Sequence, residues 1–164
     1  HRDLHSFPTR RSSDLTINVL QAVVLTNEAQ MVKTPTFYVF KLFAVHQDAT
    51  MIPLDLVCQN YTLGTEKIPA ISASASQDKT GAIHITLANL DPNRNIALTA
   101  GLGGSVKKER ISAQIITANQ MNAFNDFGRP EAVTIKPFTD LKTSNGQLKI
   151  DLPAKSVLMV ELKP

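Results

Sequence analysis

The chain has 164 residues and is 43% hydrophobic, which suits one ordinary domain and is too short for a (β/α)8 barrel joined to a second domain. Its net charge of +3, from 17 Lys and Arg against 14 Asp and Glu, is too weak to indicate a nucleic-acid partner. No apolar run reaches the roughly 18 residues of a membrane-spanning helix. The single cysteine, Cys58, excludes an intrachain disulfide.

Residues 1–15 lack the periods of a helix or a strand, and they lack the apolar core of a signal peptide. Back-translated, they resemble a common short-read sequencing adapter read in frame. We therefore interpret residues 1–15 as an artefactual, disordered segment fused to a truncated open reading frame. The alternative is a genuine disordered basic N-terminus. On the first interpretation, we do not expect the His, Ser and Asp side chains of this segment to form a catalytic or metal site.

Residues 16–26 are almost continuously apolar and β-branched, which favours a fully buried strand, although a buried helix is not excluded. Residues 27–30 are typical of a loop. Thr34 and Pro35 then predict a helix start, with an N-cap and a proline in the first helical position. Apolar side chains at helical spacing extend this helix to about residue 45. A buried strand, a loop and a helix together form a βα unit, the repeating element of a parallel barrel.

From Ala49 onward, short segments of alternating apolar and polar residues are separated by turn residues. The candidate strands are residues 51–57, 68–76, 82–89, 95–101, 110–118, 132–136, 146–152 and 156–162. The last two, joined by a Pro-Ala-Lys turn, predict a hairpin that closes a sheet. Half-buried strands without intervening helices predict a mainly β fold, an antiparallel β-sandwich of the jelly-roll kind.

Three ordered motifs carry a family resemblance. They are Thr-Pro-Thr-Phe-Tyr-Val-Phe at 34–40, followed by His-Gln-Asp-Ala at 46–49; Asn-Asp-Phe-Gly-Arg-Pro-Glu at 125–131; and Leu-Pro-Ala-Lys-Ser-Val-Leu at 152–158. Together they resemble the end of an α-L-arabinofuranosidase of glycoside hydrolase family 51. The resemblance implies that residues 16–48 are the last βα unit of a truncated catalytic (β/α)8 barrel. It implies that residues 49–164 are the C-terminal β-sandwich domain.

The resemblance also implies a function for the parent enzyme, which we expect to be bacterial. The parent would remove terminal α-L-arabinofuranosyl groups from arabinan or arabinoxylan with retention, without a metal or redox cofactor. The partners of this chain would be the missing N-terminal barrel and, through it, an arabinose-containing polysaccharide or oligosaccharide. Neither nucleic acid nor a membrane is expected as a partner. A cytoplasmic, periplasmic or secreted location and a homo-oligomeric parent are left open.

Neither family motif that carries a catalytic glutamate occurs in this chain, so we predict no catalytic residue and an inactive fragment. The glutamates of the chain are interpreted as solvated surface carboxylates; they are Glu28, Glu66, Glu109, Glu131 and Glu161. The alternative function is an independent carbohydrate-binding β-sandwich module. The absence of Trp and the presence of only two Tyr argue against that module, because such modules usually stack sugars on exposed aromatics.

Asn18 and Gln21 place amide side chains within the predicted buried strand, where they would satisfy buried partners or line the barrel mouth. They are the candidate substrate-binding residues, although the sugar-contacting glutamine of the family is expected just before Thr16. No metal site is predicted. His46 is expected to complement the dipole at the helix C-terminus, and His84 to lie on the polar face of a strand.

The loop over residues 119–131 is long enough to reach a neighbouring domain. Phe124 and Phe127 lie beside Asn125, Asp126 and Arg129 in this loop. We expect these side chains either to brace the barrel and border its cleft or to place the aromatics as a plug at the end of the sandwich.

Overall fold

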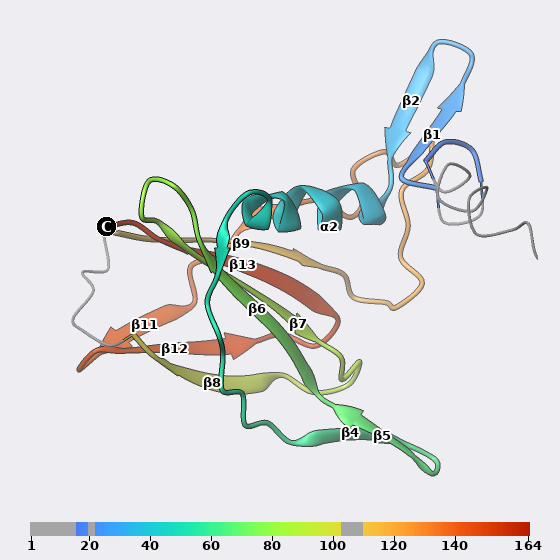
Figure 1. Ribbon diagram of the computed structural model, residues 1–164. Helices are drawn as coiled ribbons and strands as arrows, with labels where there is room; N and C mark the ends of the chain where they lie inside the picture. The colour runs from blue at the N-terminus through green and yellow to red at the C-terminus, as the bar shows by residue number, and fades with distance from the viewer. Residues whose placement is uncertain (1–15, 20–21, 103–109) are drawn as a thin grey trace, which may run out of the picture.

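The computed structural model describes residues 16–19, 22–102 and 110–164, and they form a two-layer antiparallel β-sandwich with one helix on its outside (Figure 1). The larger sheet has six strands, in the order β10 (Lys136–Pro137), β9 (Ile111–Thr117), β13 (Ser156–Leu162), β7 (Ile83–Asn89), β6 (Ile71–Gln77) and β3 (Thr50–Met51). The smaller sheet has three strands, in the order β11 (Leu141–Ser144), β12 (Gln147–Leu152) and β8 (Ile96–Gly101). The predicted mainly β, antiparallel fold is confirmed.

Two separate hairpins project from the sandwich (Figure 1). The first joins β1 (Val24–Asn27) to β2 (Gln30–Lys33) beside the start of the helix. The second joins β4 (Asn60–Leu63) to β5 (Glu66–Pro69).

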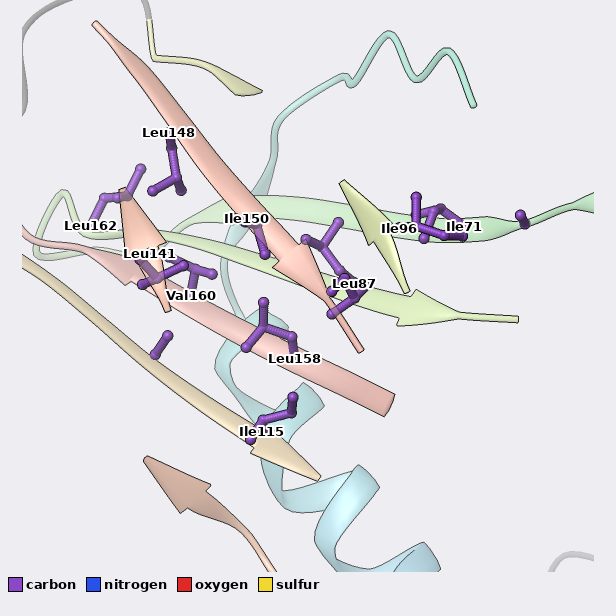
Figure 2. Packing of buried hydrophobic residues seen from close by; sticks show 13 residues of the cluster. Ile71, Leu87, Ile96, Ile115, Leu141, Leu148, Ile150, Leu158, Val160 and Leu162 are labelled. Carbon is purple, nitrogen blue, oxygen red and sulfur yellow. The ribbon is translucent and has the colours of Figure 1, made fainter. Parts of the chain in front are cut away.

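The main core lies between the two sheets, where the inward side chains of β12 meet those of β13 (Figure 2). Leu148 and Leu152 of β12 and Leu158 and Val160 of β13 are completely removed from solvent. They follow the predicted alternation, because Gln147, Lys149 and Asp151 point outward from β12. Burying one such aliphatic side chain stabilises the fold by about 1.5–3 kcal/mol.

A second apolar cluster lies on the opposite face of the larger sheet, beneath helix α2 (Pro35–Phe43). Tyr38 and Leu42 of the helix pack there against Ile116 of β9 and Met159 of β13. The predicted helix is confirmed, with Pro35 in its first turn, and a short 3₁₀ turn, η1 (Ala44–His46), continues it. The hydroxyl of Thr34 does not cap the helix but donates to the carbonyl oxygens of Ala22 and Val23, at 2.8 and 3.0 Å.

The prediction of a terminal hairpin over residues 146–162 is wrong. Strand β12 pairs with β11 and β8, whereas β13 pairs with β7 and β9, so the two runs lie in opposite layers. The Pro-Ala-Lys segment carries the chain from one layer to the other, with Lys155 in the left-handed region at φ 55°. Alternation and a short turn predict two strands, but they do not decide whether those strands bond to each other or face each other across a core.

The prediction of one fully buried strand over residues 16–26 is also wrong. Residues 16–19 are exposed, and β1 is at most half-buried. After a two-residue turn with Glu28 at φ 51°, the chain pairs back on itself as β2. The backbone groups of this apolar run therefore find an antiparallel partner in the next segment instead of parallel neighbours.

Several other strand boundaries differ from the predictions. Within residues 51–57 only Met51 is in a strand, and within residues 132–136 only Lys136 is. The run over residues 68–76 breaks at Ala70, where the end of β5 gives way to the start of β6. Strands β4 and β11 were not anticipated, because each has only four residues, too few to show a clear alternation of apolar and polar side chains.

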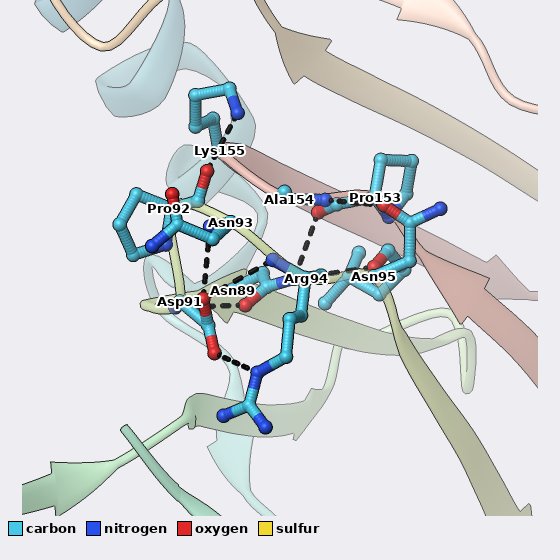
Figure 3. Close-up of polar contacts among 10 residues, drawn as sticks. Asn89, Asp91, Pro92, Asn93, Arg94, Asn95, Pro153, Ala154 and Lys155 are labelled. Carbon is cyan, nitrogen blue, oxygen red and sulfur yellow. Dashed lines mark hydrogen bonds and ion pairs between the residues drawn. The ribbon is translucent and has the colours of Figure 1, made fainter. Parts of the chain in front are cut away.

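A polar corner holds the crossover between β12 and β13 (Figure 3). The two N–H groups of the Asn89 side chain, at the end of β7, are shared among three carbonyl oxygens, those of Leu152 and Pro153 at 3.2 and 3.0 Å and that of Arg94 at 2.9 Å from Nδ2. The carboxylate of Asp91 is buried and accepts from the backbone N–H of Asn93 and from the guanidinium of Arg94. The Asn89 bonds give partners to carbonyl groups at the crossover, and the hydroxyl of Ser156 donates a further bond to the carbonyl of Pro153 at 2.6 Å.

Replacing Asn89 with Ala should lower the free energy of unfolding by at least about 2 kcal/mol, because it removes the side-chain donor to the carbonyl groups of Leu152 and Arg94. Chemical denaturation monitored by circular dichroism measures this loss. Asn95→Ala is the matched control, since Asn95 is exposed and accepts one bond, from the backbone N–H of Ala154 at 3.1 Å. Equal losses for the two variants would contradict the role assigned to Asn89.

Candidate functional site

The described glutamates lie on separate elements of the fold. Glu28 is exposed in the turn of the β1–β2 hairpin, and Glu66 is exposed at the start of β5. Glu131 is exposed in a loop, and Glu161 on β13 faces Lys163 at 3.6 Å. Glu109 lies outside the described residues. A retaining glycosidase needs two carboxyl groups about 5–5.5 Å apart, and among the described glutamates the fold builds no such pair.

Asn18, one of the two predicted substrate-binding residues, is exposed and has φ 51°. Its Nδ2 donates to the hydroxyl of Thr26 at 2.8 Å, and its Oδ1 accepts from the backbone N–H of Thr26 at 2.7 Å. The amide therefore ties the residues before β1 to that strand. Gln21, the other predicted residue, lies outside the described residues.

Two histidines that are far apart in the sequence come together on the outer face of the larger sheet. His46 of η1 bonds through Nδ1 to the hydroxyl of Ser76 at 2.7 Å and through Nε2 to the hydroxyl of Thr86 at 2.9 Å. His84 bonds through Nε2 to a carboxylate oxygen of Asp78 at 3.1 Å. Among the described residues, no group of three or more His, Cys, Asp or Glu side chains is arranged to hold a metal ion.

The strand face that carries His84 is covered, although the sequence predicted an exposed polar face. His84, Thr86 and Ser76 are all buried, and His84 Nδ1 has no hydrogen-bond partner among the described residues. The segment from the end of α2 to β3 covers this layer, a tertiary contact that the alternation along β7 does not reveal. Ser76 and Thr86 were missed as partners of His46, because no short spacing links them to it.

Burial, followed by the nearby charge of His84, lowers the pKa of His46 from its ordinary value of 6.5. The hydroxyl of Thr80, followed by His84, holds the pKa of the Asp78 carboxyl far below its usual range. The folded chain therefore favours a neutral imidazole at His46 and an ionised carboxylate at Asp78.

The stability of the fold should fall as the pH drops below 6.5, the ordinary pKa of histidine. Below that value the unfolded chain binds a proton at His46 more readily than the folded chain does, so protonation favours unfolding. Thermal melts at about pH 7.5 and about pH 5 measure the effect, which His46→Gln should reduce because an amide does not titrate there. An undiminished pH dependence in the variant would contradict the assignment.

The loop over residues 119–131 is anchored by Asn125, which is buried. Its Nδ2 donates to the carbonyl oxygens of Lys33 and Val133, each at 2.8 Å, and its Oδ1 accepts from the backbone N–H of Val133 at 2.7 Å. The loop is thereby fastened to the end of β2, across 92 residues of sequence.

The two phenylalanines of this loop do not plug the sandwich, so that alternative is wrong. Phe124 is 55% exposed and Phe127 is 39% exposed. The guanidinium of Arg129 lies over the ring of Phe124, 5.5 Å from its centroid, and donates to the carboxylate of Asp126 at 3.2 Å. The bond from Arg129, with others from backbone N–H groups, lowers the pKa of Asp126, which keeps this ion pair charged.

The sequence model of the α-L-arabinofuranosidase C-terminal domain matches residues 15–156. The chain belongs to this family. It is 42% identical over 148 residues to an intracellular exo-α-L-arabinofuranosidase of Bacteroides ovatus, a match that covers 90% of this chain and 29% of that protein.

Solved structures of family 51 arabinofuranosidases share the fold. The enzyme from Xanthomonas axonopodis pv. citri superposes with a TM-score of 0.85 at 34% identity, over 90% of this chain and 30% of that one. The enzyme from Bifidobacterium longum gives a TM-score of 0.76 at 26% identity, over 90% of this chain and 29% of that one. The chain thus spans less than a third of the length of these relatives and corresponds to their C-terminal domain. In the described part of the chain, no helix is long and apolar enough to cross a membrane.

Proposed function

We propose that this chain is the C-terminal part of a family 51 α-L-arabinofuranosidase whose catalytic barrel lies upstream. The parent would hydrolyse terminal non-reducing α-L-arabinofuranosyl groups of arabinan or arabinoxylan with retention. The observation that carries this proposal is the 42% identity to an exo-α-L-arabinofuranosidase over 90% of this chain. The two carboxylates of the reaction would come from the barrel, and the sandwich would support it.

We also propose domain boundaries within the chain. Residues 49–164 form the sandwich, and residues 16–48 are the last βα unit of the barrel. The exposed apolar side chains of this N-terminal unit support the division, since Ile17, Met31 and Phe40 are 53, 60 and 63% exposed. Residues 1–15, which we interpret as an artefact, lie outside the described residues.

Helix α2 carries apolar side chains on two faces. Tyr38 and Leu42 pack against the sandwich, whereas Phe40 and Phe43 remain exposed. A helix that is apolar on more than one face is usually buried on each of them. A barrel packed against Phe40 would complete the burial of this helix.

The purified chain alone should not hydrolyse an aryl α-L-arabinofuranoside, because it lacks the paired glutamates. The same chain extended by its natural upstream coding sequence should hydrolyse that substrate with retention, as followed by release of the aryl alcohol and by NMR of the first-formed sugar anomer. Hydrolysis by the chain alone, or an upstream sequence without a barrel that carries paired glutamates, would contradict the proposal.

Phe40→Ala should lower the free energy of unfolding of the extended enzyme by at least about 2 kcal/mol, the scale of removing a buried ring. In the chain alone the change should stay within about 0.5 kcal/mol, as for other surface substitutions. Denaturant unfolding of both proteins measures the difference. Lys41→Ala is the control, because Lys41 is exposed next to Phe40 but is not needed for the proposed apolar contact between Phe40 and the barrel. Equal effects of Phe40→Ala in both proteins would argue against docking through this face.

A further inference from the structure

A polar pocket lies between the end of β9 and the loop over residues 119–131. Its volume is ≈ 550 Å³, which is within the range of small-molecule sites. Five exposed residues among those that line the pocket carry side chains suited to binding a ligand: Asn119, Gln120, Asn122, Phe124 and Arg129.

Three of these side chains are amides. Each amide offers two donors and an acceptor. The side chains of Asn119, Gln120 and Asn122 make no hydrogen bond to the described residues. The side chain of Asn125, in contrast, bonds through both its nitrogen and its oxygen. The pocket therefore presents polar groups that remain available to a ligand.

Phe124 and Arg129 add a flat surface to these amides. The ring of Phe124 is 55% exposed, and the guanidinium of Arg129 lies 5.5 Å from its centroid. Asp126 holds this guanidinium at 3.2 Å and balances its charge, so the Phe124 platform is fixed without a net charge from the ion pair.

A flat aromatic surface beside several free amides suits a neutral saccharide. The C–H face of a sugar ring is apolar and stacks on an aromatic ring, whereas its hydroxyl groups both donate and accept hydrogen bonds around the edge. An anionic ligand would instead favour a cluster of unpaired cations, whereas Arg129 is paired with Asp126 and Lys136 is the one pocket cation without an ion pair among the described residues.

The position of the pocket indicates which saccharide it would bind, if the parent enzyme has the proposed function. Asn125 fastens the loop to Lys33 at the end of β2, and the β1–β2 hairpin directly precedes helix α2 within the proposed last βα unit. In (β/α)8 enzymes the segments that follow the strands lie at the catalytic face. The loop would thus lie beside the mouth of the barrel, along the path of the polysaccharide.

We propose that this pocket is a binding subsite for the pentose polysaccharide on which the parent enzyme acts. Phe124 supplies the stacking surface, and Asn119, Gln120, Asn122 and Arg129 supply hydrogen bonds to hydroxyl groups. The subsite is a recognition element that lies outside the catalytic centre and belongs to the sandwich.

Titration of the ¹⁵N-labelled chain with arabinopentaose tests the proposal by NMR. The side-chain amide signals of Asn119, Gln120 and Asn122 should shift, and Phe124→Ala should weaken binding at least about tenfold. Phe40→Ala is the matched control, because that ring is similarly exposed on helix α2, outside the pocket, and binding should stay within about twofold. Asn122→Leu provides a second variant if Phe124→Ala disturbs the fold, and it should weaken binding at least about threefold.

The absence of shifts at these amides, or equal weakening by Phe124→Ala and Phe40→Ala, would overturn the proposal. Equally tight binding of cellopentaose would overturn the assignment of a pentose ligand. The titration requires no catalysis, so its failure is distinct from failure of the proposed function, which is tested by hydrolysis in the extended enzyme.

Discussion

The burial of β13 on both faces is the constraint on which the rest of the structure depends. Leu158 and Val160 point into the core between the sheets, and Met159 points into the cluster beneath α2. Its backbone pairs on both sides, with β7 and β9. One strand thus joins the sandwich to the helix that would belong to the barrel, so the two parts share a single packed layer.

Polar side chains decide how this layer is connected. The amide of Asn89 holds the carbonyl groups of the β12–β13 crossover, which places the two terminal strands in opposite sheets. The side-chain amide of Asn125 likewise bonds to backbone carbonyl groups, and it fastens the loop over residues 119–131 to the end of β2. In both places one buried amide satisfies several backbone groups that the strands themselves leave unpaired.

The surface left by this arrangement divides into two parts with different chemistry. The β1–β2 hairpin and the outer face of α2 expose isolated apolar side chains, which suits packing against another domain. The pocket beside Asn122 and Phe124 combines amides with an aromatic ring, which suits a hydroxyl-rich ligand. A C-terminal domain that both supports a barrel and contacts its polysaccharide would use these two surfaces together.

The sequence by itself determined the alternation along β7, β9, β12 and β13, the start of α2 at Thr34 and Pro35, and the family, because these depend on local pattern and on short ordered motifs. Only the tertiary structure decided that β12 and β13 face each other across the core, that His46 meets Ser76 and Thr86, and that Phe124 remains exposed. These features depend on contacts between segments that are distant in sequence, where hydrogen bonding and burial choose among partners that the local pattern leaves equivalent.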